Sequence, residues 1–237
     1  MIEIIKDKLL KRVKGRVKKS ISRFQSIGRQ KVFGIGNNKT GTTSLEAAME
    51  RLGFVVGDQI TDIQYTRDWG QRDFESLIKY CKYGQFFQDN PFSKPFTFIV
   101  LDHEFPNSKF ILTVRDNPEQ WYNSLIKFHA KLWGKDGRIP NKEDLINDTK
   151  FYKGYRWEKN RIHFNTPIDD LYNKDILIES YKRHNKNVRD YFRHRPDDLL
   201  VLNVANDGSY QKLCDFLDVK SEWQDFPWKN KTKEVKQ

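Results

Sequence analysis

The sequence predicts an α/β protein with three α/β/α layers and a central, mostly parallel sheet of about five strands. Its 237 residues, 37% hydrophobic and 14% aromatic, are enough to bury one sizeable core, so we expect one domain. Short β-branched and aromatic runs alternate with longer stretches of helical period, a pattern typical of βαβ units. The predicted strands are 32–36, 53–56, 85–88, 109–114 and 199–204, and the predicted helices are 43–52, 71–82, 95–104, 118–133, 174–194 and 209–217.

A basic arm at residues 1–30 precedes the predicted domain at 31–237. Residues 1–31 hold 11 Lys and Arg against 2 Asp and Glu, and the rest of the chain holds 32 against 30. Because the basic charge is confined to the arm, we expect no nucleic-acid partner. An apolar stripe at helical spacing predicts an amphipathic helix, which either packs on its own domain or contacts a membrane surface through residues 1–25. The stripe consists of Ile2, Ile5, Leu9, Val13, Val17, Ile21 and Phe24.

Hydropathy and cysteine content indicate the cellular compartment in which the protein acts. No run of 18 apolar residues occurs, and the N-terminus is charged throughout, so we expect neither a spanning helix nor a signal peptide. Cys81 and Cys214 are too few for a disulfide framework or a metal knuckle, which predicts two buried thiols in a reducing compartment. The prediction is a cytoplasmic protein, with peripheral membrane association through the arm as the alternative.

The segment KVFGIGNNKTGTTSLEAAMERLG predicts a strand, a polar turn and a helix that Gly53 ends. Thr43 and Glu46 have the spacing of a capping box, which would fix the start of the helix. The first N–H groups of a helix have no intrahelical partner and the helix dipole is positive there, so this turn is suited to an anion. Lys39 would supply a charge, Gly41 a close approach of the backbone, and the residues from Thr42 to Ser44 their hydroxyls.

The turn is not the phosphate loop of nucleoside triphosphatases. Their G-x-x-x-x-G-K-[ST] pattern requires a glycine just before the lysine, whereas Asn38 precedes Lys39 and Gly41 follows it. The run FIVLD, which ends at Asp102, is similar to a metal-binding strand, but residues 95–104 fit a helix as well. A nucleotide-dependent kinase or NTPase therefore remains an alternative.

The turn resembles the 5′-phosphosulfate loop of the sulfotransferase superfamily. Members carry a K-x-G-[ST]-[ST] or K-T-G-T-[ST]-[SA] core after a strand, in a P-loop-type α/β fold, and use 3′-phosphoadenosine-5′-phosphosulfate (PAPS) as sulfonate donor. The resemblance implies that Lys39 contacts the bridging oxygen and the transferred sulfonate, while the other residues hold the 5′-phosphate. The matching residues are Lys39, Thr40, Gly41, Thr42, Thr43 and Ser44.

A second motif, SKFILTVRDNPEQWYNSL, is similar to the 3′-phosphate site of the same family. That site pairs an arginine at a strand end with a serine about eight residues later, which implies Arg115 and Ser124. The spacing here is nine, so Asn123 or Asn117 could replace Ser124. The alternative for Arg115 is a salt bridge to Asp116 or to a neighbouring helix.

Two further segments extend the similarity to residues 31–232, especially to bacterial sulfotransferase-like proteins. They are FFQDNPF at 86–92 and FLDVKSEWQDFPWKNKT at 216–232. The second resembles a tail that closes over the donor nucleotide, which implies Lys229, Asn230 and Lys231 as phosphate contacts. By themselves, these residues also fit a solvated basic tail.

Sulfonate transfer requires alignment and charge neutralisation, and the resemblance implies that Lys39 provides them without a metal. The acceptor hydroxyl or amine also needs a base. The candidates are Asp89, His103, Glu104 and His129. We favour Asp89 because it follows the predicted strand 85–88 at the sheet edge of the phosphate loop; its alternative role is a hydrogen bond within the following Asn-Pro turn.

The region at 134–170 loses helical periodicity and is rich in polar, glycine and aromatic residues. Long connections are often functional, so we expect acceptor binding or a lid here, with a surface excursion as the alternative. The helix at 174–194 has the strongest pattern, and Pro196 closes it. The aromatic residues of the connection are Tyr152, Tyr155, Trp157 and Phe164, and the apolar face of the helix is Leu177, Tyr181, His184, Val188, Tyr191 and Phe192.

The sequence thus predicts a PAPS-dependent sulfotransferase that acts on a hydroxyl or amine acceptor. Carbohydrate, lipid, phenol and peptide acceptors all remain open, because acceptor specificity resides in loops. The alternatives are the kinase or NTPase, which would require a divalent metal, and a non-catalytic binding module that works through the basic arm.

Overall fold

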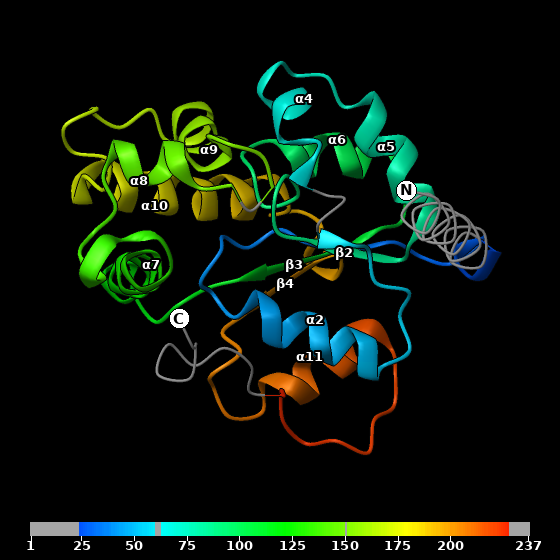
Figure 1. The fold of residues 1–237 in the computed structure, drawn as a ribbon. Coiled ribbons are helices and arrows are strands. Elements are labelled where there is room, and N and C mark those ends of the chain that lie inside the picture. The colour runs from blue at the N-terminus through cyan, green and yellow to red at the C-terminus, as the bar shows by residue number, and fades with distance from the viewer. Residues whose placement is uncertain (1–23, 60–62, 150, 228–237) are drawn as a thin grey trace, which may run out of the picture.

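The structure is a computed structural model that describes residues 24–59, 63–149 and 151–227. Nearly all of the predicted arm, and the predicted contacts Lys229, Asn230 and Lys231, lie outside these residues. Strands and helices alternate along the chain, and helices cover both faces of one sheet (Figure 1). The strands are β1 (Val32–Gly34), β2 (Phe86–Gln88), β3 (Lys109–Thr113) and β4 (Leu199–Leu202). The helices are α2 (Thr42–Arg51), α4 (Thr66–Gly70), α5 (Glu75–Tyr80), α6 (Thr97–Glu104), α7 (Pro118–Trp133), α8 (Lys142–Asn147), α9 (Tyr155–His163), α10 (Lys174–Tyr191) and α11 (Ser209–Leu217), with 3₁₀ turns at Cys81–Tyr83, Lys135–Gly137 and Pro196–Asp198.

The sheet is parallel, with the strand order β2-β1-β3-β4. It has four strands among the described residues, so the prediction of about five is wrong. The predicted strand 53–56 forms only a bridge from Val56 to Phe86. Backbone bonds from Gln85 N to Val55 O and from Gly57 N to Phe86 O bring this segment against the start of β2. The pairing is too short to make a fifth strand.

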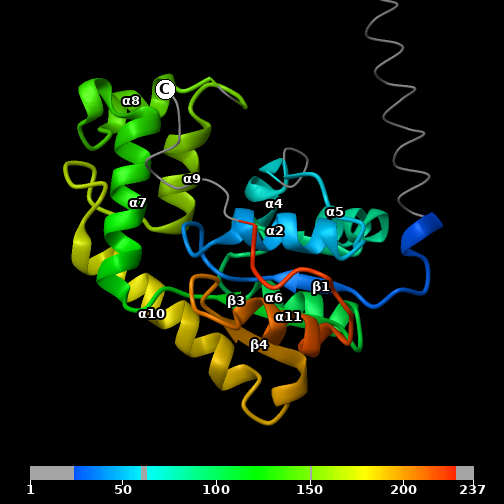
Figure 2. The same ribbon diagram turned by 90° about the horizontal axis from the view of Figure 1, so that it is seen from below.

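The two faces of the sheet form separate cores, because successive strand residues point to opposite sides. Phe33 and Phe110 face α5, α6 and α10, whereas Val32 and Ile111 face α2 and α11. A third apolar cluster joins α7, α8 and α10 through Trp121 and other side chains. Figures 1 and 2 show α7, α8 and α9 grouped at one end of the molecule, away from α5.

Two predicted helices have the bounds that the sequence indicates, and two other local predictions are wrong. The helices at 118–133 and 209–217 have the predicted bounds. The predicted helix 71–82 instead begins at Glu75, as α5, and passes into the 3₁₀ turn at Cys81–Tyr83, because the chain turns at Arg72, whose φ is 64°, and Asp73 accepts a hydrogen bond from Glu75 N. The capping box is also wrong: Gly41 caps α2 without a side-chain bond, and Glu46 accepts a hydrogen bond from Gln88.

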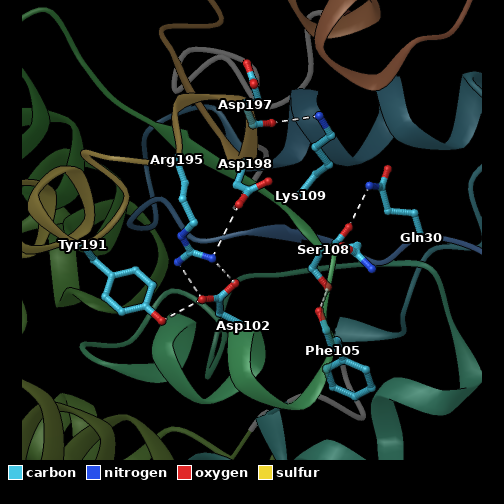
Figure 3. A network of polar contacts seen from close by, with 10 residues as sticks. Gln30, Asp102, Phe105, Ser108, Lys109, Tyr191, Arg195, Asp197 and Asp198 are labelled. Atoms are coloured by element: carbon cyan, nitrogen blue, oxygen red, sulfur yellow. Dashed lines mark hydrogen bonds and ion pairs between the residues drawn. The ribbon is translucent and has the colours of Figure 1, made fainter.

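Asp102 lies on α6, not on a strand, and forms part of a structural network (Figure 3). Its carboxylate accepts hydrogen bonds from Arg195 at 2.7 and 3.1 Å and from the Tyr191 hydroxyl at 2.7 Å. Burial alone would raise the pKa of Asp102, but these hydrogen bonds hold it below its ordinary value. The network links α6 to the end of α10.

Asp102→Asn is expected to lower the free energy of unfolding at pH 7 by about 1–2 kcal/mol, since Arg195 is partly exposed and keeps some hydration. A depressed folded pKa stabilises the protein above the ordinary aspartate value of about 3.9, and this contribution is lost as pH falls through the folded value. The difference between variant and wild type should therefore shrink below about pH 4. Urea unfolding at pH 7, 5 and 3.5 measures this.

Asp197→Asn is the matched control, because Asp197 is exposed and binds Lys109 through its backbone carbonyl at 2.8 Å. If both variants lose the same stability at pH 7, the ion pair of Asp102 contributes nothing specific.

Candidate functional site

The loop from β1 to α2 has a conformation that its glycines make possible. Gly36 lies so close to β3 that a Cβ there would be 2.6 Å from the backbone nitrogen and oxygen of Thr113. Gly41 has a φ of 101°, and its Cβ would collide with Val204. Lys39 also has a positive φ, 72°. The loop is therefore held tightly at both ends, and Lys39 occupies its bend.

The loop and the first turn of α2 line a cavity of about 290 Å³, which we call the loop cavity. Thr42, Thr43 and Ser44 line it, and the first turn of α2 contains no acidic residue. The positive end of the helix therefore faces the cavity without local neutralisation. Thr40 does not line it: its buried hydroxyl donates to Asn37 O at 2.5 Å and lies 2.6 Å from the Thr113 hydroxyl. Thr40 braces the loop against β3.

Lys39 lines the loop cavity with its ammonium 3.4 Å from the centre of the Phe128 ring of α7. Burial lowers the pKa of Lys39 to about 8, repulsion by Arg115 acts in the same direction, and Asp89 opposes both. The cation–π contact holds the ammonium in place but is not a hydrogen bond. An anion in the cavity would therefore supply Lys39 with a charged partner.

Arg115 follows β3 and contacts the loop directly. Its Nε donates to Lys39 O at 2.7 Å, and its backbone N–H donates to the Tyr181 hydroxyl of α10 at 3.0 Å. Its terminal nitrogens form no hydrogen bond or ion pair within the described part of the chain. The alternative of a salt bridge to Asp116 is wrong, because that carboxylate accepts hydrogen bonds from Asn203 and Gln120 instead. The guanidinium is thus positioned and left available to a ligand.

Asp89 follows β2, lines the loop cavity and is 6% exposed. Its carboxylate accepts hydrogen bonds from the side-chain amides of Asn38 and Gln59 and, at 3.0 Å, from Asn90 N. A carboxylate has about four acceptor positions. Asp89 therefore both holds the turn, as its alternative role required, and keeps capacity for one more donor.

The other predicted residues do not all meet at this cavity. His129 of α7 lines it, whereas His103 and Glu104 lie at the end of α6, which leads into the start of β3 and thus to the opposite sheet edge. Ser124 is half-buried on α7 and lines neither the loop cavity nor an outer hollow of about 360 Å³ beside it. Asn117 lines the outer hollow together with Arg115 and caps α7 by accepting from Gln120 N.

The sequence analysis does not predict several of the lining side chains, among them Asn38, Gln59, Phe128, Arg156 and Lys159. Phe128 stands one helical turn after Leu125 on the apolar stripe of α7, a weak signal of burial. The spacing of Arg156 and Lys159 indicates one face only once α9 is known to be a helix. The region 134–170, which contains α8 and α9, therefore contributes to the site.

A model of the family described as a sulfotransferase domain matches residues 31–235, most of the chain and all of the elements above. The chain belongs to the sulfotransferase family. Comparison with individual curated proteins gives no match.

Membership in the sulfotransferase family agrees with the parallel α/β architecture and with a site at the carboxyl ends of β1, β2 and β3. Asp102 sits on α6 in an ion pair with Arg195 and does not line the loop cavity. Within the described residues, no helix is both long and apolar enough to cross a membrane, and no three His, Cys, Asp or Glu side chains form a candidate metal site.

Proposed function

We propose that this sulfotransferase-family protein uses PAPS as its donor and transfers the sulfonate group to a hydroxyl or amine. The observation that carries the proposal is the loop cavity, where Lys39, Arg115 and the start of α2, which has no side-chain cap, converge. Gly41 lines this cavity at the N-terminus of α2, where a phosphate would meet the first N–H groups of the helix. A donor with phosphates at two positions fits this distribution of positive groups.

In this proposal the N-terminus of α2, with Thr42, Thr43 and Ser44, holds the 5′-phosphate. Arg115 holds the 3′-phosphate, and Asn117 is better placed than Ser124 to accompany it, because it lines the outer hollow with Arg115. PAPS supplies an activated sulfonate. Lys39 neutralises charge that develops on the bridging and sulfonate oxygens, a contribution that grows in the transition state.

The acceptor must lose a proton as its bond to sulfur forms. Asp89 is the proposed base, because its carboxylate lines the cavity with one acceptor position unused. The side-chain amides of Asn38 and Gln59 fix the orientation of this carboxylate, so it is held in one position relative to the acceptor. His129 is the second candidate, although burial lowers its pKa well below the ordinary value. Uncharged at neutral pH, it would be able to accept a proton.

Arg115→Ala is expected to weaken binding of adenosine 3′,5′-bisphosphate, the donor product, about tenfold to a hundredfold, as lost charged hydrogen bonds contribute about 1.5–3 kcal/mol. Isothermal calorimetry on wild type and variant measures it, with ATP plus magnesium as the competing ligand. Arg183→Ala, an exposed arginine on α10, is the matched control.

Tighter binding of the bisphosphate than of ATP, weakened only in Arg115→Ala, supports the proposal. A magnesium-dependent preference for ATP would favour the kinase alternative. Binding of neither nucleotide would favour the non-catalytic module, which deletion of residues 1–25 then tests.

A further inference from the structure

A second cavity adjoins the loop cavity and lies between α7, α8, α9 and α10. This inner cavity measures about 50 Å³ and shares Asn38, His129, Trp133, Arg156 and Lys159 with the loop cavity. Its walls are largely apolar and aromatic and include Trp121, Leu125, Phe164, Leu171, Tyr172 and Leu177. A group bound there would therefore lie directly beside the site proposed for sulfonate transfer.

The inner cavity has basic groups and no carboxylate among its described lining residues. Lys94, Arg156 and Lys159 line it. Lys94 is 1% exposed and contacts His163 Nδ1. Lys159 forms no hydrogen bond or ion pair with the residues that the structure describes.

The positive charge of Arg156 is only partly balanced by a nearby carboxylate. It lies 3.5 Å from Asp148, outside the lining, and its Nε has no hydrogen-bond partner within the described residues. Buried cations without a bonded partner are costly, because burial removes their hydration.

Burial also lowers the pKa values of the two lysines, that of Lys159 to about 8 and that of Lys94 well below its ordinary value. Asp89 attracts both amino groups electrostatically but forms no hydrogen bond or ion pair with either of them.

The donor does not account for these groups. Its phosphates are assigned to α2 and Arg115, and its sulfonate to Lys39. Lys94 and His163 line the inner cavity only and take no part in the loop cavity. Lys94, together with Arg156 and Lys159, therefore acts on whatever enters beyond the transferred group, which is the position of an acceptor.

We propose that the acceptor carries an anionic group, such as a carboxylate, on an apolar or aromatic body, and that Lys159, Lys94 and Arg156 bind this group in the inner cavity. This inference rests on the proposed function, because it assumes that the loop cavity holds the donor. It narrows the class of acceptors from any alcohol or amine to alcohols and amines that also carry an acidic group. Lys159 acts as a specificity residue.

The test compares an acid with its neutral ester in protein saturated with adenosine 3′,5′-bisphosphate, which blocks the donor site. The probes are 4-hydroxybenzoate and its methyl ester, titrated by calorimetry. The acid should bind at least tenfold more tightly than the ester. Lys159→Met should reduce this preference to about one while leaving ester binding within twofold. Lys153→Met, the same charge change at an exposed position, should keep the wild-type preference.

Thermal unfolding of Lys159→Met checks its fold, and we expect no loss of stability, because the substitution removes a half-buried charge without a bonded partner. Equal binding of acid and ester, no binding of the acid at millimolar concentration, or an unchanged preference in Lys159→Met overturns the inference. Bisphosphate affinity is measured first for every variant. If wild type fails to bind the bisphosphate, the proposed function fails; if it binds and the acid shows no preference, only this inference fails.

Discussion

Lys39→Met is expected to slow the release of adenosine 3′,5′-bisphosphate from PAPS about a hundredfold to a thousandfold, the usual effect of removing a group that stabilises transition-state charge. Binding of the bisphosphate should weaken less than tenfold, because the product lacks the sulfonate that Lys39 contacts in the proposed mechanism. Chromatographic measurement of bisphosphate release, with water as the acceptor, needs no knowledge of the natural acceptor.

The control is Lys127→Met, an exposed position next to Phe128 on α7, which makes the same change of charge. It should retain the wild-type rate. A Lys39 variant that loses equal factors in affinity and turnover would show that the lysine binds ground state and transition state alike. A variant with the wild-type rate would remove Lys39 from the mechanism.

Gly36→Ala is expected to cause the largest loss of stability, about 3 kcal/mol or more, because overpacking against backbone cannot be relieved by a rotamer change. The added Cβ would collide with the Thr113 hydroxyl and lie 2.6 Å from the backbone nitrogen and oxygen of the same residue. Relief requires separation of β1 from β3, and this also displaces the loop from β1 to α2. Urea unfolding at pH 7 measures the stability, and bisphosphate binding reports whether the loop keeps its geometry.

Gly53→Ala provides the comparison, since its φ is 79° and nothing lies within 4 Å of the added Cβ. That variant isolates the conformational cost of a positive φ, about 1–2 kcal/mol. If Gly36→Ala costs no more than this, the loop is not packed rigidly against β3 and its geometry does not depend on Gly36.

Some corrections trace to interactions that sequence patterns do not record. The capping box at Thr43 and Glu46 satisfies the local spacing rule, but Gln88 of β2 binds Glu46 instead. Asp102 ends a run that fits a buried strand as well as a helix, and only its pairing with Arg195, far along the chain, shows the structural role. The absent fifth strand depends on how far residues 53–56 pair with β2, which is also a non-local property.

The sequence by itself determined the parallel α/β architecture, the loop around Lys39, Arg115 at the end of β3, and the bounds of α7 and α11. These features follow from periodicity and from strand-to-helix turns, which involve residues close together in the chain. The tertiary structure alone decided that Asn38 and Gln59 orient Asp89, and that α9 brings Arg156 and Lys159 to the cavity. Long-range packing set these positions, because a side chain's neighbours across a cavity depend on how separate helices meet and leave no periodic trace in the sequence.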